Sequence, residues 1–254
     1  MSSKPLLKCL VSALLTIVFL GPNTAHAQSF VPEKGAVLKL VSAEDGDNFP
    51  KYASDIGLAT AVIGSVVGAS FLSYYADKRD LDPYLLSPLV DFGLAFAVNN
   101  LLTFGLKHTV QRARPYAYSN LFQSEASDIY SESERNDAYH SFPSGHTSNT
   151  AAATFAVATS LAIHLPSQEN RPMVIASLYS LSTILTGFVG YMRIKGGYHF
   201  YSDVISGALL GAIAGTVTPI VHHLLVPDSS ELSMTANPLS RSTVPMSIHF
   251  RGRF

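Results

Sequence analysis

Five apolar segments constrain the fold of this chain more than any other feature. Each is about as long as a helix must be to cross the hydrocarbon core of a bilayer, roughly 20 residues. The segments are residues 56–74, 85–106, 147–165, 174–192 and 204–225. Charged residues make up only 14% of the chain, against about 25% in typical soluble domains. The sequence therefore predicts an all-α fold, a bundle of about five long apolar helices.

Two environments are compatible with such helices. In the first, they span a membrane and turn their small and polar residues toward one another. In the second, they form the core of a soluble, exported bundle. Glycines recur at every fourth position at Gly64 and Gly68, and again at Gly207, Gly211 and Gly215. Such small-residue ladders let membrane helices approach closely, and we favour the membrane interpretation.

The N-terminus has the pattern of an export signal. Two lysines, Lys4 and Lys8, precede an apolar run at residues 9–20. Residues 25–27 (Ala-His-Ala) match a small-x-small cleavage site. We expect residues 1–27 to be a signal peptide and Gln28 to begin the mature chain; the alternative is an uncleaved first membrane helix. Either way, the next segment starts outside the cytoplasm. The only cysteine, Cys9, lies in this region, so the mature chain would contain no disulfide.

Composition divides the rest of the chain into three parts. Residues 28–55 form a polar N-terminal arm, residues 56–226 hold the apolar segments in a single domain, and residues 227–254 form a polar tail. Within the domain, the acidic connection at residues 116–142 is either a lid over a site or a solvated loop. The formal net charge of −1 offers no global field that would attract nucleic acid, and no protein partner can be inferred.

Polar residues at the segment ends indicate a topology. If the chain starts outside the cytoplasm and crosses the membrane once with each segment, the same polar residues all reach the outer face. These residues are Lys107, Arg114, His146, Arg193 and His199. We therefore expect a site at the periplasmic helix ends of an inner-membrane protein, with positively charged residues also in the inner loops.

The first polar cluster contains Lys107, Arg114 and Pro115. Seven residues are nearly two helical turns, so a continuous helix would turn Lys107 and Arg114 to the same side. Two cations at the mouth of an apolar helix form a site for an anion. The alternative is that both side chains simply extend to the membrane interface.

The second cluster is Pro-Ser-Gly-His at residues 143–146, directly before an apolar segment. Ser144 or Thr147 could cap the helix that follows, and Gly145 allows close approach to the backbone. A helix N-terminus presents N–H groups and a positive dipole end to an anion. His146, in the first turn, could donate a proton to a leaving oxygen. On its own, the tetrapeptide could also be only a helix cap.

The third cluster follows the fourth apolar segment and contains Arg193, the glycines at 196–197, His199 and Asp203. The histidine and the aspartate are spaced i, i+4, so the carboxylate can hold one ring nitrogen at the start of a helix. The other nitrogen then carries a directed lone pair, as in an activated nucleophile. A single His–Asp pair could equally be structural.

The three clusters together resemble the type 2 phosphatidic acid phosphatase (PAP2) family, which also includes bacterial acid phosphatases and vanadium haloperoxidases. The family signature is K-x6-RP, then PSGH, then SR-x5-H-x3-D. This chain contains KHTVQRARP at residues 107–115, PSGH at 143–146 and MRIKGGYHFYSD at 192–203, with every spacing matched. The one departure is Met192, which replaces the serine before Arg193. The resemblance covers roughly residues 56–225.

The resemblance implies three catalytic residues. His199 would be the nucleophile that forms a phosphohistidine, and Asp203 would orient it. His146 would act as general acid toward the leaving group and then as general base toward water. The domain at residues 56–226 is thus expected to be a PAP2-type phosphatase domain.

The resemblance also implies a set of phosphate-binding residues. Three cations, Lys107, Arg114 and Arg193, would bind the phosphate oxygens, assisted by Ser144 and Gly145 at the helix start. Three fixed cations can neutralise the charge of a phosphoryl group, so we expect no metal and no cofactor. Vanadate would be bound only if the protein were a haloperoxidase.

The expected function is removal of a terminal phosphate from a phosphomonoester or pyrophosphate, most plausibly on a membrane lipid. Candidate substrates are phosphatidic acid, phosphatidylglycerol phosphate, isoprenyl pyrophosphate and lipid A phosphates. The alternatives are a soluble periplasmic acid phosphatase of broad specificity, a vanadate-dependent haloperoxidase, and a transporter or scaffold that retains a phosphate pocket.

Other histidines have weaker support. His108 and His140 flank the clusters and could line the mouth of the site. We expect His164, His222 and His223 to be interfacial or exposed. The adjacent pair at 222–223 is weak evidence for a metal site, because no carboxylate lies nearby at ligand spacing.

Overall fold

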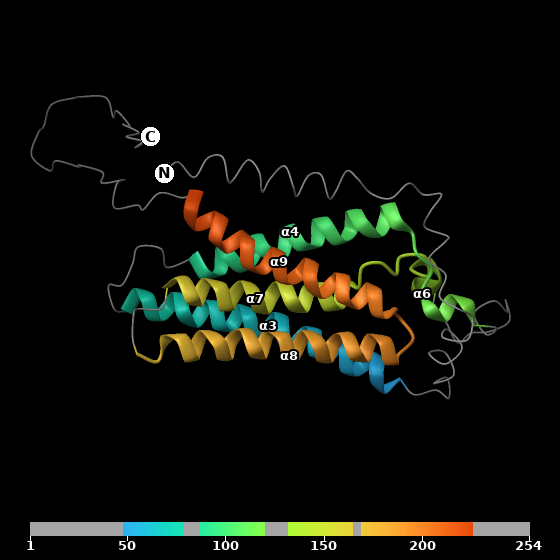
Figure 1. Ribbon diagram of the computed structural model, residues 1–254, viewed down its shortest axis with the longest axis horizontal. Helices are drawn as coiled ribbons and strands as arrows, with labels where there is room; N and C mark the ends of the chain where they lie inside the picture. Colours follow the sequence, from blue (N-terminus) through green and yellow to red (C-terminus); the bar gives the residue numbers. More distant parts are fainter. Residues whose placement is uncertain (1–47, 79–86, 120–131, 165–168, 226–254) are drawn as a thin grey trace, which may run out of the picture.

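The computed structural model describes residues 48–78, 87–119, 132–164 and 169–225. The predicted signal peptide at 1–27 and the polar tail at 227–254 lie outside the described residues. Helices are the only regular elements in these ranges (Figure 1), which confirms the all-α prediction. The described end of the predicted arm at 28–55 belongs to the first long helix, which begins at Phe49.

Five long helices make up the bundle, together with two short ones near one end (Figure 1). The long helices are α3 (Phe49–Lys78), α4 (Ser87–Val110), α7 (Gly145–His164), α8 (Arg171–Lys195) and α9 (Tyr201–Leu225). The short elements are the 3-10 helix η2 (Pro115–Tyr118) and α6 (Glu132–Asn136). The described residues thus contain five long helices, in approximate agreement with the predicted bundle of about five.

Helix α7 is the central helix and packs against each of the other four long helices. Its composition explains this position. The alanines at 151–153 and Ala156 are fully buried, and Thr150 and Ser160 are buried with them. Small side chains let neighbouring backbones approach closely, so one helix can touch four partners.

The glycines of α9 rest on the backbone of α7. A Cβ atom on Gly207 would lie 2.5 Å from the carbonyl oxygen of Ser144, and one on Gly211 would overlap the carbonyl oxygen of Ser148. A Cβ atom on Gly215 would lie 2.7 Å from a backbone carbonyl oxygen one turn further along α7. The ladder predicted at 207, 211 and 215 thus brings α9 close to the backbone of α7.

The second predicted ladder is wrong at Gly64. No described atom of a neighbouring element lies within 4 Å of the position that a Cβ on Gly64 would take. On Gly68, a Cβ would meet Val157 at 3.7 Å, which is an ordinary contact. The buried face of α3 runs through Ala61, Ser65 and Ala69, and Gly64 lies beside that face in an exposed position.

Polar side chains join α4 to α7 inside the bundle. Asn99 is fully buried and donates to the Oδ1 of Asn149 at 2.6 Å. The hydroxyls of Thr103 and Ser148 are 3.1 Å apart. Hydrogen bonds between helices stabilise packing where apolar side chains gain little from leaving lipid.

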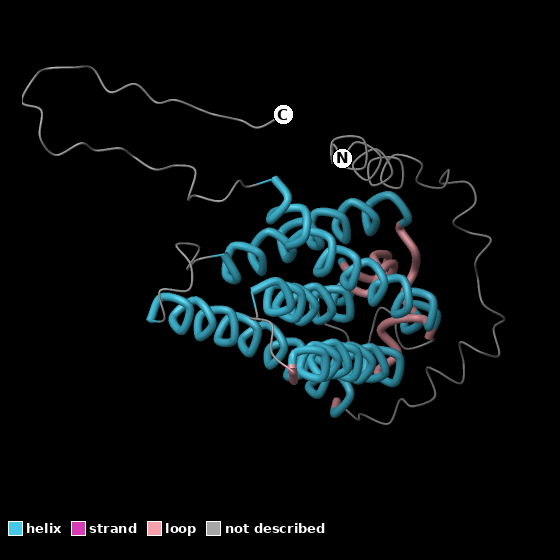
Figure 2. The backbone as a smooth tube through the Cα atoms, turned by 60° about the vertical axis from the view of Figure 1, so that its left-hand side comes forward, coloured by secondary structure: helices cyan, strands magenta, loops and turns pink. Residues whose placement is uncertain are grey.

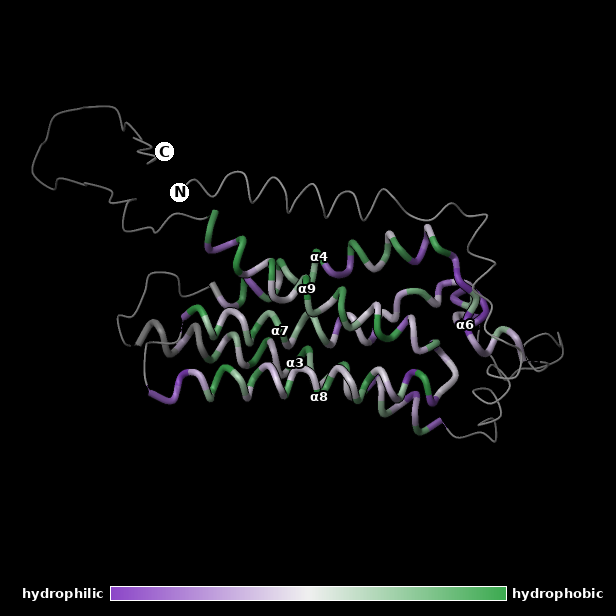
Figure 3. Tube along the Cα trace, in the orientation of Figure 1, coloured by the Kyte–Doolittle hydropathy of each residue, from purple (hydrophilic) through white to green (hydrophobic). Residues whose placement is uncertain are grey.

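The long helices are mostly apolar or neutral along their length, and hydrophilic residues lie mainly near the helix ends, above all at the end that carries α6 (Figure 3). Phe104 is 62% exposed and Ile184 is 66% exposed. Four helical segments are long and apolar enough to cross a membrane: Phe49–Phe71, Pro88–Tyr118, Arg171–Lys195 and Tyr201–Leu225. Contiguous exposed apolar surface of this kind is that of a membrane protein.

The chain direction brings the ends of all five long helices together at one end of the bundle. Helices α4 and α8 end there, whereas α3, α7 and α9 begin there (Figure 1). Figure 2 shows the described loops concentrated at this end. The three polar clusters lie in these loops and first or last turns, so the fold assembles them from distant parts of the sequence.

The glycine contact generates a prediction about stability. Gly211→Ala should destabilise the bundle by about 1–3 kcal/mol, because the added methyl group must push α9 away from the α7 backbone. Gly64→Ala is the matched control. It should be neutral or stabilising by up to about 1 kcal/mol, because alanine favours the helix and meets no neighbour. Thermal unfolding in detergent measures both; equal effects would show that the contact is not tight.

Candidate active site

His199 lies in the turn between α8 and α9, and it is 1% exposed. Its Nδ1 is 3.7 Å from the Oδ2 of Asp203, which is longer than a hydrogen bond. Ser141 fills the gap, because its Oγ lies 3.4 Å from Nδ1 and donates to Asp203 at 2.6 Å. The predicted His–Asp pair therefore exists, and Ser141 lies between its members.

The other ring nitrogen of His199 faces the cations. Its Nε2 is 3.1 Å from the Nη1 of Arg114. A guanidinium can only donate, so Nε2 is the nitrogen that carries the lone pair. Burial, and then the positive charge of Arg114, lower the pKa of His199 well below its ordinary 6.5. The imidazole is thus neutral at pH 7 and its lone pair is directed into the phosphate-binding cluster.

Arg114 is buried and held from several sides. Its Nε donates to the carbonyl of Asp137 at 2.9 Å, its Nη1 donates to the carbonyl of Tyr198 at 3.2 Å, and its Nη2 binds the carboxylate of Asp137. Helix α4 ends at Val110, and Arg114 has extended backbone angles. The expectation that Lys107 and Arg114 share one face of one helix is therefore wrong; the chain turns between them.

The other two cations reach the site from α4 and α8. Lys107 donates to the carbonyl of His140 at 2.8 Å, and its Cε would be 3.7 Å from a Cβ on Gly145. Arg193 is 6% exposed, and its guanidinium lies 4.2 Å from the centre of the Tyr198 ring. Lys107 and Arg193 are also among the charges that act on His199. The structure thus brings the three predicted cations around one imidazole.

The Pro-Ser-Gly-His turn begins α7, as predicted. Helix α7 starts at Gly145, and the hydroxyls of Ser144 and Thr147 are 2.9 Å apart. The backbone N–H of Ser144 donates to the carbonyl of Asp203 at 2.9 Å, which ties this turn to the start of α9. The first N–H groups of a helix lack partners within the helix and can bind an anion.

His146 has a partner that the sequence did not indicate. Its Nε2 is 2.9 Å from the Oδ1 of Asp55 on α3. The same oxygen lies 3.7 Å from Arg193, whose Nη1 also donates to Ser54 at 3.3 Å. Asp55 stands about 90 residues from His146 in the chain and within the stretch expected to be a polar arm, so no local pattern could reveal it.

Arg112 is a further functional residue that sequence reasoning missed. Its Nη1 donates to the Oδ1 of Asp203 at 2.7 Å and to Ser202 at 2.6 Å, and its guanidinium lies 4.3 Å from the centre of the Phe200 ring. Arg112 falls within the variable interval of the K-x6-RP pattern, which carries no information on its role. It balances the charge of the fully buried Asp203.

The acidic connection at 116–142 is packed against the site in its described part. Glu134 of α6 binds Lys51 at 2.9 Å and accepts a hydrogen bond from Tyr198 at 3.0 Å. Asp137 binds Arg114 through its carboxylate. This side of the site is therefore covered by protein, and an anionic side chain already contacts one of the three cations.

Comparison with known proteins identifies the family of this chain. The family model of the PAP2 superfamily matches residues 88–226, more than half of the chain. The chain belongs to the PAP2 superfamily. The resemblance inferred from the three motifs is thereby confirmed. The PAP2 match contains every residue of the predicted site, whereas Asp55 and the rest of α3 precede it.

Two curated relatives are similar to this PAP2 protein. Phosphatidylglycerophosphatase B of Bacillus subtilis is 30% identical over 120 residues, which are 47% of this chain and 51% of that protein. Probable lipid phosphate phosphatase 4 of Arabidopsis thaliana is 27% identical over 176 residues, 64% of this chain and 57% of that protein. The chain thus spans little more than half the length of the curated relatives it matches.

One solved structure is also similar. It is the crystal structure of a transmembrane PAP2-type phosphatidylglycerolphosphate phosphatase from Bacillus subtilis, with 21% identity and a TM-score of 0.40. The match covers 76% of this chain and 94% of that chain.

The environment of His199 generates a prediction about its protonation. Because its pKa is lowered well below 6.5, the imidazole should stay neutral when the pH falls from 8 through 6.5. NMR of histidine-labelled protein in detergent, with His199→Gln to assign the signal, measures this directly. A titration centred near 6.5 or above would mean that burial and Arg114 do not control this ring.

Proposed function

We propose that the protein is a membrane phosphatase that hydrolyses a phosphomonoester or pyrophosphate of a lipid through a phosphohistidine at His199. The observation that carries the proposal is the buried imidazole of His199, whose Nε2 faces Arg114 and whose pKa is lowered by burial and by that charge. A neutral nucleophile beside fixed cations suits attack on an anionic phosphoryl group, because the cations stabilise charge on the transferring oxygens.

In the first step, Lys107, Arg114 and Arg193 bind the phosphoryl oxygens and Nε2 of His199 attacks phosphorus. A P–N bond forms as the bond to the leaving oxygen breaks, and the doubly protonated form of His146 donates one proton to that oxygen and becomes neutral. The Nδ1–H of His199 is held toward Ser141 and Asp203 throughout. This arrangement keeps the ring in the correct tautomer while it gains positive charge.

In the second step, water attacks the phosphohistidine. His146 accepts a proton from the water, a P–O bond forms, and the P–N bond breaks to return the electron pair to Nε2. Asp55 holds one ring nitrogen of His146 in both steps. When phosphate binds, the carboxylate of Asp137 must either share the guanidinium of Arg114 with the phosphate or move away from Arg114.

We propose a lipid as the substrate because the site lies at the ends of helices whose outer faces are apolar. A substrate anchored in the bilayer would present its headgroup at that level. The names of the two curated relatives also refer to phosphorylated lipids. The outer, periplasmic face of a bacterial inner membrane is the proposed location, in keeping with the export signal expected at residues 1–27.

The test is phosphate release by the purified full chain in detergent, in the presence of a chelator. The substrates are phosphatidic acid, phosphatidylglycerol phosphate, an isoprenyl pyrophosphate and a soluble aryl phosphate, and the control is His199→Gln. We expect chelator-resistant release from lipid phosphates that is lost in the control. Quenching in an alkaline denaturant should trap phosphate on wild-type protein only, and acid should then release that phosphate.

Other outcomes would contradict parts of the proposal. Strong release from the aryl phosphate alone would favour a soluble-substrate acid phosphatase. Full activity in His199→Gln would exclude the phosphohistidine. Absence of phosphate release, combined with halide oxidation that depends on added vanadate, would favour the haloperoxidase alternative, in which His199 would hold vanadate.

The phosphate clamp generates its own prediction. Arg193→Ala should raise the activation barrier by about 3 kcal/mol, roughly 10²-fold in kcat/KM, since a charge partner of the transition state is lost. Lys107→Ala and Arg114→Ala should act in the same direction. The matched control is Arg171→Ala at the other end of α8, where the guanidinium donates to the carbonyl of Ala162 at 2.7 Å. Near-wild-type turnover of Arg193→Ala would show that the clamp is wrongly assigned.

A further inference from the structure

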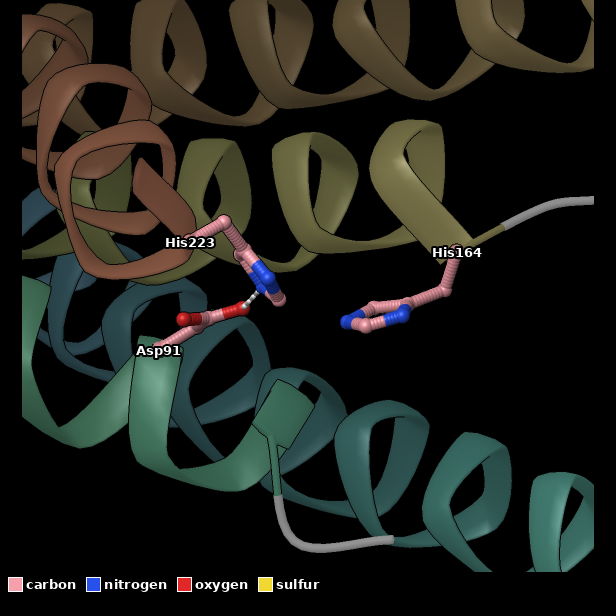
Figure 4. Close-up of side chains that lie close together, drawn as sticks. All are labelled: Asp91, His164 and His223. Atoms are coloured by element: carbon pink, nitrogen blue, oxygen red, sulfur yellow. Dashed lines mark hydrogen bonds and ion pairs between the residues drawn. The ribbon is translucent and has the colours of Figure 1, made fainter. Parts of the chain in front are cut away.

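A second cluster of ionisable side chains lies at the end of the bundle opposite the candidate active site. It consists of Asp91, His164 and His223, which come from the start of α4 and the ends of α7 and α9 (Figure 4). Lys107 is 16 residues further along α4 than Asp91, which places the two sites about 24 Å apart along the helix. The proposed reaction uses none of these three side chains.

The fold supplies the carboxylate that the sequence around His222 and His223 lacks. Asp91 is fully buried, and its Oδ2 lies 3.1 Å from the Nε2 of His223. Its Oδ1 lies 2.6 Å from the Nδ1 of His222. These partners are more than 130 residues apart in the chain, so the pairing is a product of how α4 packs against α9.

His164 adds a third donor from α7. Its ring lies 4.8 Å from the ring of His223, centre to centre, and the two planes meet at 71°. Figure 4 shows the His164 ring extending from the end of α7 toward the other two side chains. One nitrogen or oxygen atom from each of Asp91, His164 and His223 lies within 4.8 Å of the others.

We propose that Asp91, His164 and His223 bind a divalent transition-metal ion such as Zn²⁺, which ties the ends of α4, α7 and α9 together. Two imidazoles and a carboxylate are ligands that zinc accepts, at about 2.0–2.2 Å from the ion. In a tetrahedral site such ligands are about 3.3 Å apart. The contact between Asp91 and His223 already has nearly this length, so only His164 must move closer.

The surroundings of Asp91 fit this role. Ser160 donates to its Oδ2 at 2.6 Å, and His222 contacts its Oδ1. Partners of this kind orient a ligating carboxylate and strengthen metal binding. The competing explanation is a hydrogen-bonded network that neutralises a buried carboxylate without any ion. The two explanations make different predictions for replacement of His164. The hydrogen-bonded network would survive, because Asp91 keeps its contacts to His222, His223 and Ser160. A metal site would lose one of its three ligands.

The position of the site indicates a structural role. The ion would join three helices at the bundle end far from His199, so it would stabilise the packing without touching the phosphoryl group. A ligand that binds only the folded state raises the apparent stability in proportion to its affinity and concentration. Binding should therefore appear as a rise in melting temperature.

The experiment uses the purified full chain in detergent, stripped with a chelator that is then removed. Zn²⁺ is titrated by calorimetry, the bound metal is counted after desalting, and melting curves are recorded with Zn²⁺ and with Mg²⁺. The variants are His164→Gln and His223→Gln. The control is His108→Gln, at the opposite end of the bundle, where the rings of His108 and His140 are 4.9 Å apart.

We expect about one Zn²⁺ per wild-type chain, a higher melting temperature with Zn²⁺ but not with Mg²⁺, and at least roughly tenfold weaker binding in both variants. The control should bind like the wild type. The proposal is overturned if the wild type binds no Zn²⁺, or if His164→Gln binds it as tightly as the wild type. It is also overturned if His108→Gln abolishes binding, because the ion would then lie at the other end.

Discussion

The close contact between α9 and α7 is the interaction on which the rest of the structure depends. Glycines at one face of α9 let its backbone lie against carbonyl groups of α7. The first of these contacts, between Gly207 and Ser144, lies one turn beyond Asp203. The same approach allows the N–H of Ser144 to bond the carbonyl of Asp203. Packing of two apolar helices thus fixes the distance between the motif that begins α7 and the motif that begins α9.

Charge balance is the second organising principle of this end of the bundle. Asp203 is fully buried, which is tolerable only because Arg112 and Ser141 meet its two oxygens. Asp203 is therefore neutralised without a proton from His199. The imidazole stays neutral among the cations, so its lone pair at Nε2 is not occupied by a proton.

The sequence predicted the helical bundle and the members of the site because apolar segment length and short motifs are local properties. It failed where a partner is set only by packing. Asp55, Arg112 and Ser141 lie outside the signature positions, and each acquires its contact through a neighbouring helix or loop. The prediction of a close helix contact at Gly64 was wrong for the opposite reason. Its spacing fits a ladder, but α3 presents that position to no described neighbour.

The composition of α7 has a consequence for membrane insertion. Within the described residues, four helical segments are long and apolar enough to cross a membrane, and α7 is not among them. Its hydroxyl-bearing and small side chains are buried against the other helices, so lipid is a poor solvent for α7 when it is alone. Its transfer into the membrane must therefore be coupled to its neighbours, α4 before it and α8 and α9 after it. The central helix of the fold therefore depends on the other helices of the bundle for its place in the membrane.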